Sequence, residues 1–84
     1  MDDIEITQRL KTIVTPYVQN KNGLKDFNEN TGFINDLEIN SANLVDVVLD
    51  VEDEFDISID NQSMEEMLSV GDAKSIIQNK LAEK

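Results

Sequence analysis

The hydroxyl group of Ser41 is the side-chain group in this sequence whose position best suits a chemical role. Ser41 stands at the predicted start of an amphipathic helix, after a long stretch without helical periodicity. Serine is a preferred N-cap residue, and for an arbitrary serine in such a place capping is the commoner role. The free N–H groups and the dipole of a helix N-terminus also favour a phosphate group attached there. The residues alone therefore allow a modification of Ser41 but do not establish one.

The residue types that usually perform catalysis are absent or poorly placed. The chain has no His and no Cys, which excludes an imidazole base, a thiolate nucleophile and a zinc site of the usual ligand types. Its carboxylates fall on the solvent side of predicted helices, where they make weak general acids at neutral pH. Residues 56–60 alternate oxygen ligands as a calcium loop does, but Asn61 and Met67 stand where that loop needs Gly and Glu. We expect neither an enzyme nor a dedicated metal site.

Acidic residues are concentrated in the middle of the chain, around Ser41. The 84 residues hold 18 acids and 7 bases, a formal net charge of −11. Between Lys25 and Lys74 there are 14 acids and no base, whereas the rest holds 4 acids and 7 bases and sums to +3. Such a chain is repelled by nucleic acids and anionic lipids, and no apolar run approaches the roughly 20 residues that span a bilayer. The acidic middle is either a solvated surface or a docking face for basic partners.

The elements that must position Ser41 are predicted from apolar spacing. It indicates an all-α fold, a small four-helix bundle of three main helices and one short helix. We expect a single domain over residues 1–84, with main helices over residues 3–18, over residues 41–55 and from Ser69 onward, and the short helix over residues 60–68. The start of the chain lacks the basic and apolar pattern of a secretory signal, so we expect a cytoplasmic protein.

Capping residues and one proline set the expected helix ends. The predicted N-caps are Asp2, Ser69 and either Asn40 or Ser41. Pro16 lies inside the first predicted helix and has no N–H to donate, so we expect a kink or a frayed last turn there. Residues 19–35 are rich in Asn and Gly and are predicted to form a long loop. Its expected anchors in the core are Leu24, Phe27, Phe33 and Ile34.

The helix over residues 41–55 is predicted to have one apolar and one acidic side. At about 100° per residue, the inward side holds Leu44, Val45, Val48, Val51 and Phe55. The opposite side holds Asp46, Asp50, Asp53 and Glu54, with Leu49 at the border. Residues 57–59 are predicted to be an extended linker. From the short helix we expect Met64, Met67 and Leu68 to face inward, and from the last helix Val70, Ala73, Ile76, Ile77 and Leu81.

Three blocks of this sequence resemble the acyl carrier protein family. Residues 36–46, DLEINSANLVD, are similar to the family segment DLGxDSLxxVE around its modified serine. Residues 52–59, EDEFDISI, are similar to its EExFxIxI segment, and residues 69–73 to its TVGD entry into the last helix. Phe33 lies three residues before the Asp-Leu pair, as it does in the family. The resemblance covers essentially the whole chain.

The resemblance implies that Ser41 carries 4′-phosphopantetheine, attached from coenzyme A by a phosphopantetheinyl transferase. The thiol of that arm would hold acyl groups as thioesters, which suits a chain without Cys. The implied partners are acyl-transferring, condensing or ligase enzymes with basic docking surfaces, bound weakly by a monomeric carrier. The residues implied to bind partners are Val45, Asp46, Leu49, Glu52 and Asp53. The residues implied to line an acyl cleft are Val48, Phe55, Ile59 and Leu68.

Four positions depart from the family pattern. Asn40 and Ala42 replace the usual Asp and Leu beside the serine, and Glu38 and Asp60 replace a usual Gly and Pro. The changes beside Ser41, together with the longer loop, favour a specialised carrier dedicated to one pathway. Two other hypotheses remain open at this point: an aminoacyl or peptidyl carrier of a dedicated biosynthetic pathway, and an unmodified acidic adaptor that binds proteins.

Overall fold

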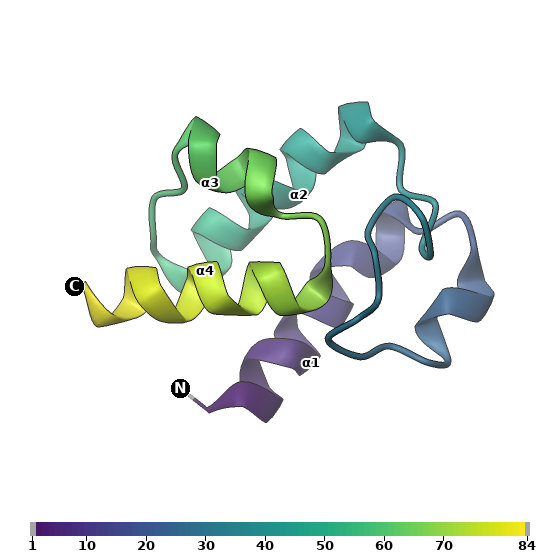
Figure 1. Ribbon diagram of the computed structural model, residues 1–84, viewed down its shortest axis with the longest axis horizontal. Coiled ribbons are helices and arrows are strands. Elements are labelled where there is room, and N and C mark those ends of the chain that lie inside the picture. The colour runs from purple at the N-terminus through teal and green to yellow at the C-terminus, as the bar shows by residue number, and fades with distance from the viewer. Residues whose placement is uncertain (1, 84) are drawn as a thin grey trace.

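The computed structural model describes residues 2–83, and within them the chain forms four α-helices, two 3₁₀-helices and no strand (Figure 1). The α-helices are α1 (Asp3–Val14), α2 (Ser41–Phe55), α3 (Asn61–Glu66) and α4 (Val70–Ala82). The 3₁₀-helices are η1 (Thr15–Tyr17) and η2 (Lys21–Leu24). The predicted all-α fold with three main helices and one short helix is therefore confirmed.

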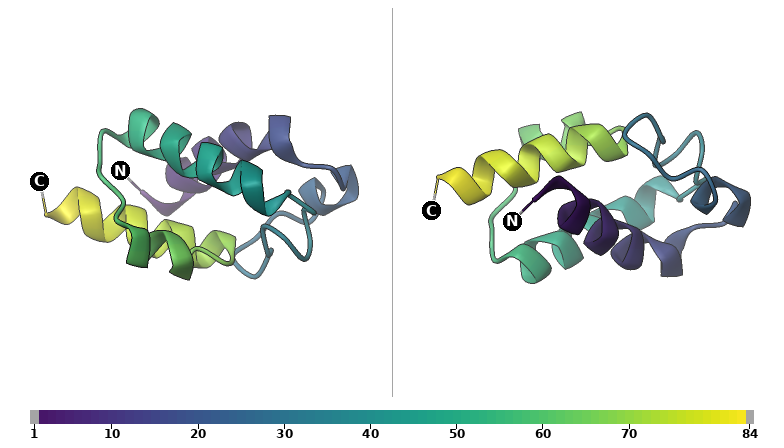
Figure 2. Two further views of the ribbon diagram at one scale, coloured as in Figure 1. Left: turned by 90° about the horizontal axis from the view of Figure 1, so that it is seen from above. Right: turned by 90° about the horizontal axis from the view of Figure 1, so that it is seen from below.

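The three long helices surround one core, because α1 packs against both α2 and α4. The long connection between α1 and α2 lies at one end of the bundle, and the two chain ends lie at the other (Figures 1 and 2). The first residues of α2 are at the end where the long connection lies, and the linker from α2 to α3 is at the opposite end (Figure 2). Ser41 and this linker therefore lie at opposite ends of α2.

Helix α1 is shorter than predicted, because it ends at Val14 rather than at residue 18. Asp2 caps it as expected, since its Oδ1 accepts a hydrogen bond from the N–H of Glu5 at 2.8 Å. Pro16 has no N–H to extend the α-helical ladder, and the chain tightens there into the 3₁₀ turn η1. The expected break at Pro16 is thus confirmed.

The long connection is packed onto the core as predicted, but one of its four expected anchors is wrong. Phe33 is fully buried, and Leu24 and Phe27 are half-buried against the core. Ile34 is 44% exposed. The backbone turns directly after Phe33, where the N–H of Asp36 bonds to the carbonyl of Gly32, and this turn directs the Ile34 side chain outward. The irregular stretch also continues beyond residue 35, up to the start of α2, and contains η2.

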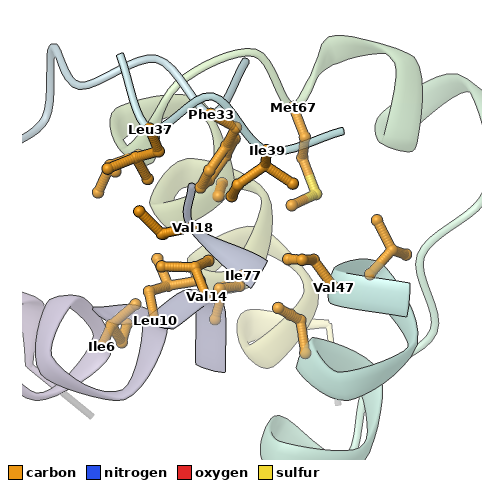
Figure 3. Packing of buried hydrophobic residues seen from close by; sticks show 14 of the residues in the cluster. Ile6, Leu10, Val14, Val18, Phe33, Leu37, Ile39, Val47, Met67 and Ile77 are labelled. Atoms are coloured by element: carbon orange, nitrogen blue, oxygen red, sulfur yellow. The ribbon is translucent and has the colours of Figure 1, made fainter. Parts of the chain in front are cut away.

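The core joins apolar side chains from every long helix and from the long connection (Figure 3). Among them are Phe33 and Leu37 of the connection, Val14 of α1 and Ile77 of α4. The fully buried residues also include Ile6, Leu10, Ile39, Val47, Val51, Met67 and Val70. The segment that leads to Ser41 is therefore anchored in the core by its own buried side chains.

Helix α2 has the predicted bounds, but the prediction of which valines are buried is wrong at one position and incomplete at another. Val45 is 48% exposed, whereas Val47, which was not predicted to face inward, is fully buried. At about 100° per residue, Val47 lies on the same side as Val51 and Phe55, and Val45 lies outside that arc. The predicted apolar arc was therefore centred too far toward Val45, so that it included Val45 and left out Val47.

Helix α3 is shorter than the predicted 60–68, since it covers Asn61–Glu66, and Leu68 does not face inward as expected. Met67 is fully buried and Met64 half-buried, but Leu68 is 65% exposed. The chain leaves the helical path at Met67, and the carbonyl of Leu68 accepts a hydrogen bond from the N–H of Phe33, so the Leu68 side chain faces outward. Ser69 caps α4 as predicted, since its Oγ accepts a hydrogen bond from the N–H of Asp72 at 3.2 Å.

Candidate functional site

Ser41 is the first residue of α2, and its side chain is exposed. The cap of this helix is Asn40, whose side-chain oxygen accepts a hydrogen bond from the N–H of Ala42 at 2.9 Å. The carbonyl of Asn40 accepts two more, from Asn43 at 2.8 Å and from Leu44 at 3.1 Å. The open question of which residue caps α2 is therefore answered in favour of Asn40. The hydroxyl of Ser41 is not needed to start the helix.

The segment before Ser41 is held firmly, which fixes the place of the hydroxyl. Leu37 and Ile39 are buried in the core, and the N–H of Ile39 bonds to the carbonyl of Phe33 at 3.0 Å. Glu38, between them, is exposed and has a left-handed backbone with φ of 54°. Gly adopts that conformation without strain, and Glu does not. Glu38 replaces the usual Gly in the family segment quoted above, so the structure gives a reason for that Gly.

The surroundings of Ser41 suit a phosphate ester. The hydroxyl lies at the positive end of the dipole of a 15-residue helix, and the first turn of that helix contains no acid. The residues on either side, Asn40 and Ala42, are neutral. Negative charge on this helix begins at Asp46, more than one turn further on. The residues present therefore fit a phosphodiester attached at Ser41.

Beside Ser41, α2 presents an exposed strip of mixed apolar and acidic character. It consists of Val45, Asp46, Leu49 and Asp53, which we call the exposed α2 face. Spacings of three, four and seven residues bring these side chains onto one side of a helix. Val45 is 48% and Leu49 53% exposed. Four of the five residues predicted to bind partners therefore share one accessible surface.

The fifth, Glu52, is engaged within the fold. It is half-buried, and its Oε2 accepts a hydrogen bond from the N–H of Ile59 at 2.7 Å. Within residues 2–83 no side-chain hydrogen bond or ion pair is recorded for Asp46 or Asp53. Some acids of α2 thus bond to other parts of the fold, and others do not. Sequence reasoning did not foresee that Glu52 belongs to the first group.

Two more acids of α2 are also held by internal contacts. The hydroxyl of Tyr17 donates to Asp50 Oδ2 at 2.9 Å, and this hydrogen bond to a carboxylate raises the pKa of Tyr17. Arg9 donates to Glu54 Oε2 at 2.8 Å, and its guanidinium lies 5.9 Å from the centre of the Phe55 ring. These contacts tie α2 to α1 and η1, away from the exposed α2 face.

Three of the four residues expected to line an acyl cleft belong to the core cluster or pack against it, and the fourth, Leu68, does not. Val48 and Phe55 are buried in the core, and Ile59 is half-buried at its edge. Leu68 is 65% exposed. Among the residues that the structure describes, no group of three acids is placed to hold a metal ion.

Sequence reasoning missed the buried ammonium group of Lys74. Its residue is only 8% exposed, and its Nζ pairs with the carboxylates of Glu29 and Asp3. The hydrogen bond to Glu29 raises the pKa of Lys74. No local signal marks this group, because its partners come from two distant segments. It joins α4 to α1 and to the long connection and takes no part in the site at Ser41.

Comparison with curated proteins decides the family. An acyl carrier protein of Lactobacillus acidophilus is 35% identical over 80 residues, which cover 94% of this chain and 96% of that protein. One of Thermotoga maritima is 35% identical over 79 residues, covering 92% and 93%. One of Prochlorococcus marinus is 32% identical over 80 residues, covering 95% and 98%. The chain belongs to the acyl carrier protein family.

The resemblance seen in the sequence is therefore confirmed, and with it a carrier role in general. Acyl carrier proteins are non-catalytic, which agrees with the absence of His and Cys from this chain. No model of a known protein family matches the chain. In the part of the chain that the structure covers, residues 2–83, no helix is long and apolar enough to span a membrane.

Proposed function

We propose that this acyl carrier protein holds acyl groups as thioesters on a 4′-phosphopantetheine arm attached to Ser41, and that it delivers them to partner enzymes as a monomeric, cytoplasmic carrier. The observation that carries the proposal is the exposed position of the Ser41 hydroxyl at the start of α2. Its hydroxyl is exposed and relieved of capping by Asn40, at a helix N-terminus whose first turn is free of acids.

The residues around Ser41 explain how such a group is accommodated. In a phosphopantetheinyl transferase, the Ser41 oxygen would bond to the phosphorus that carries the pantetheine arm in coenzyme A. The pyrophosphate P–O bond would break, adenosine 3′,5′-bisphosphate would leave, and the hydroxyl proton would be released. The dipole of α2 stabilises the added negative charge. Asn40 keeps the helix start fixed through its bond to the N–H of Ala42. When attached, the arm supplies the thiol that this cysteine-free chain lacks.

Partner enzymes dock on the exposed α2 face in this proposal. Among residues 2–83, Asp46 and Asp53 form no side-chain hydrogen bond or ion pair and both are exposed, so both charges are available to steer a basic surface. Val45 and Leu49 between them supply apolar contact area at short range. Binding of this kind weakens with salt and allows rapid release. The matched test compares partner binding by Asp46→Lys with partner binding by Glu83→Lys. The second variant makes the same change of charge at the far end of α4.

The acyl cleft that we propose is lined by fewer of the four candidate residues than the sequence indicated. Val48 and Phe55 remain its candidates on α2, and Ile59 remains its candidate on the linker. Leu68 is left out, because its side chain faces solvent. An acyl chain would enter by displacing the half-buried Ile59 from the edge of the core.

The residues beside Ser41 support a carrier dedicated to one pathway. Asn40 caps α2 as the usual Asp would, since the two residues cap equally well, but it brings no charge. Ala42 is exposed and presents a single methyl group where the family has Leu. A partner enzyme that requires a charged and a bulky group at these two positions finds neither.

The experiment is modification by a phosphopantetheinyl transferase, followed by intact mass measurement. The full chain is incubated with coenzyme A and each of several transferases, alongside Ser41→Ala and the control Ser58→Ala, which removes another exposed hydroxyl. The proposal predicts one added 4′-phosphopantetheinyl group in the wild type and in Ser58→Ala, and none in Ser41→Ala. Absence of the group with every transferase would sink the proposal.

A further inference from the structure

The linker between α2 and α3 is fastened to α2 by Glu52. The carbonyl of Glu52 accepts hydrogen bonds from the N–H groups of Asp56 and Ile57, the latter at 3.2 Å. Its side chain reaches further along the linker and accepts a bond from the N–H of Ile59 at 2.7 Å. One residue thus holds the first half of the linker through its backbone and the second half through its carboxylate.

The element that follows this linker is weakly held, so its position depends on how the linker is fastened. Helix α3 has six residues and none of them is buried. Its N-terminus follows the linker at Asp60, and beyond its C-terminus the chain is fixed by the fully buried Met67 and by the bond from Phe33 to Leu68. Segments with little buried apolar surface open locally at low free energy. Releasing Ile59 would therefore free the linker and the start of α3 while the far end stays in place.

The carboxylate of Glu52 is also within reach of a docked partner. Glu52 is half-exposed, and it lies beside Leu49 of the exposed α2 face, three residues earlier on the helix. A guanidinium group binds a carboxylate through two parallel hydrogen bonds and engages both oxygens. An arginine that docks there competes with the N–H of Ile59 for the same Glu52 oxygen.

We propose that Glu52 is a latch whose carboxylate holds the α2–α3 linker closed, and that basic groups of a docked partner open it by taking this carboxylate. The latch lies about 16 Å along α2 from Ser41, so docking at the exposed α2 face loosens the carrier at the opposite end from the attachment point. In this role Glu52 is a positioning residue. The partner half of the proposal rests on the proposed function, whereas the latch is a property of the chain alone.

The latch is tested by amide hydrogen exchange at Ile59, measured by NMR on the full chain. Hydrogen bonds to charged acceptors are among the stronger ones in proteins, so Glu52→Ala should speed exchange at Ile59 roughly tenfold to a hundredfold. Glu52→Gln keeps an oxygen acceptor and should restore most of the protection. Asp53→Ala is the control, because it removes an adjacent exposed acid that forms no side-chain hydrogen bond or ion pair with any described residue. Unchanged exchange of core amides such as Leu10 shows that each variant is folded.

Docking is imitated with a short oligoarginine peptide, with an oligoglycine peptide of the same length as control. Binding is followed through the amide shifts of the exposed α2 face. The proposal predicts that oligoarginine speeds exchange at Ile59 several-fold in the wild type, and has no further effect on the already fast exchange in Glu52→Ala. Added salt should reverse the effect.

Three results would overturn the proposal: exchange at Ile59 in Glu52→Ala within twofold of the wild type, oligoarginine bound at the exposed α2 face with exchange at Ile59 unchanged, or no oligoarginine bound there at all. None of these measurements involves Ser41, so failure of the latch is distinct from failure of the attachment site.

Discussion

Replacing Glu38 by Gly should stabilise the protein, although it removes a side chain from the segment that leads to Ser41. Glu38 has a left-handed backbone, with φ of 54°, and its side chain is exposed. The left-handed conformation costs a non-glycine residue about 1–2 kcal/mol. Gly avoids that strain but loses roughly 0.5–1 kcal/mol through the greater freedom of the unfolded chain. The expected net gain is about 0–1.5 kcal/mol, which corresponds to a rise of up to about 12 °C in Tm for a domain of this size.

The assay is thermal and urea denaturation of Glu38→Gly, with two controls that separate backbone strain from charge. Glu38→Gln removes the same negative charge from the acidic middle but leaves the strained backbone, so it should give less stabilisation. Glu65→Gly makes the same substitution inside α3, where Gly should destabilise by roughly 0.5–1 kcal/mol. If Glu38→Gly is no more stable than Glu38→Gln, the reasoning from backbone strain is refuted.

Three further predictions concern stability. Gly23→Ala should destabilise the protein by about 1–3 kcal/mol in urea denaturation. The added Cβ would lie 2.8 Å from the carbonyl oxygen of Asp36 and would displace the long connection that leads to Ser41. Unchanged stability would contradict this prediction. Hydrogen bonding to Ser63 lowers the pKa of Asp60 from 3.8, so the stability that this N-cap contributes is complete above pH 3.8 and is lost as the pH falls through the folded pKa. Asp60→Asn should flatten that part of the urea-midpoint profile, and an equal slope in both proteins would count against it. Raising the ionic strength from about 0.01 M to about 0.15 M should raise the Tm, because the screening length falls from about 30 Å to about 8 Å. Screening weakens the repulsion among the 14 acids of the middle segment. An unchanged Tm would argue against such repulsion.

The clearest successes of sequence reasoning occurred where several local signals coincide. The bounds of α2 were predictable because apolar periodicity, a capping residue and the extended pattern of residues 57–59 agree. The caps at Asp2 and Ser69 are likewise local, since each bond spans three residues. The place of Ser41 on α2 follows from the same short-range pattern.

The errors and omissions occurred where the outcome depends on distant partners or on the path of the chain between helices. Ile34 and Leu68 face solvent because the backbone turns beside each of them, and apolar spacing does not record such turns. Lys74 is buried because Glu29 and Asp3 reach it from other segments. The bond from Ile59 to Glu52 spans seven residues across an irregular linker, so nothing in the helical pattern indicated it.

The charge pattern gains a more specific meaning from the structure. Of the acids along α2, Asp50 and Glu54 bond to residues of η1 and α1, and Glu52 bonds to the linker. Asp46 and Asp53 form no side-chain hydrogen bond or ion pair within the part of the chain that the structure describes. A description by net charge counts all of these alike, whereas the structure distinguishes acids that hold the fold together from acids that are available to a partner.

The central claim is that Ser41 is the attachment point, and site mapping by mass spectrometry tests it most directly. Trypsin is unsuitable, because the stretch between Lys25 and Lys74 contains no cleavage site and holds several serines. A protease that cleaves after glutamate releases residues 39–52, in which Ser41 is the single hydroxyl-bearing residue. After treatment with transferase and coenzyme A, the account predicts that this peptide carries the 4′-phosphopantetheinyl group. Finding the group on any other peptide, or an unmodified 39–52 peptide from fully modified protein, would contradict it.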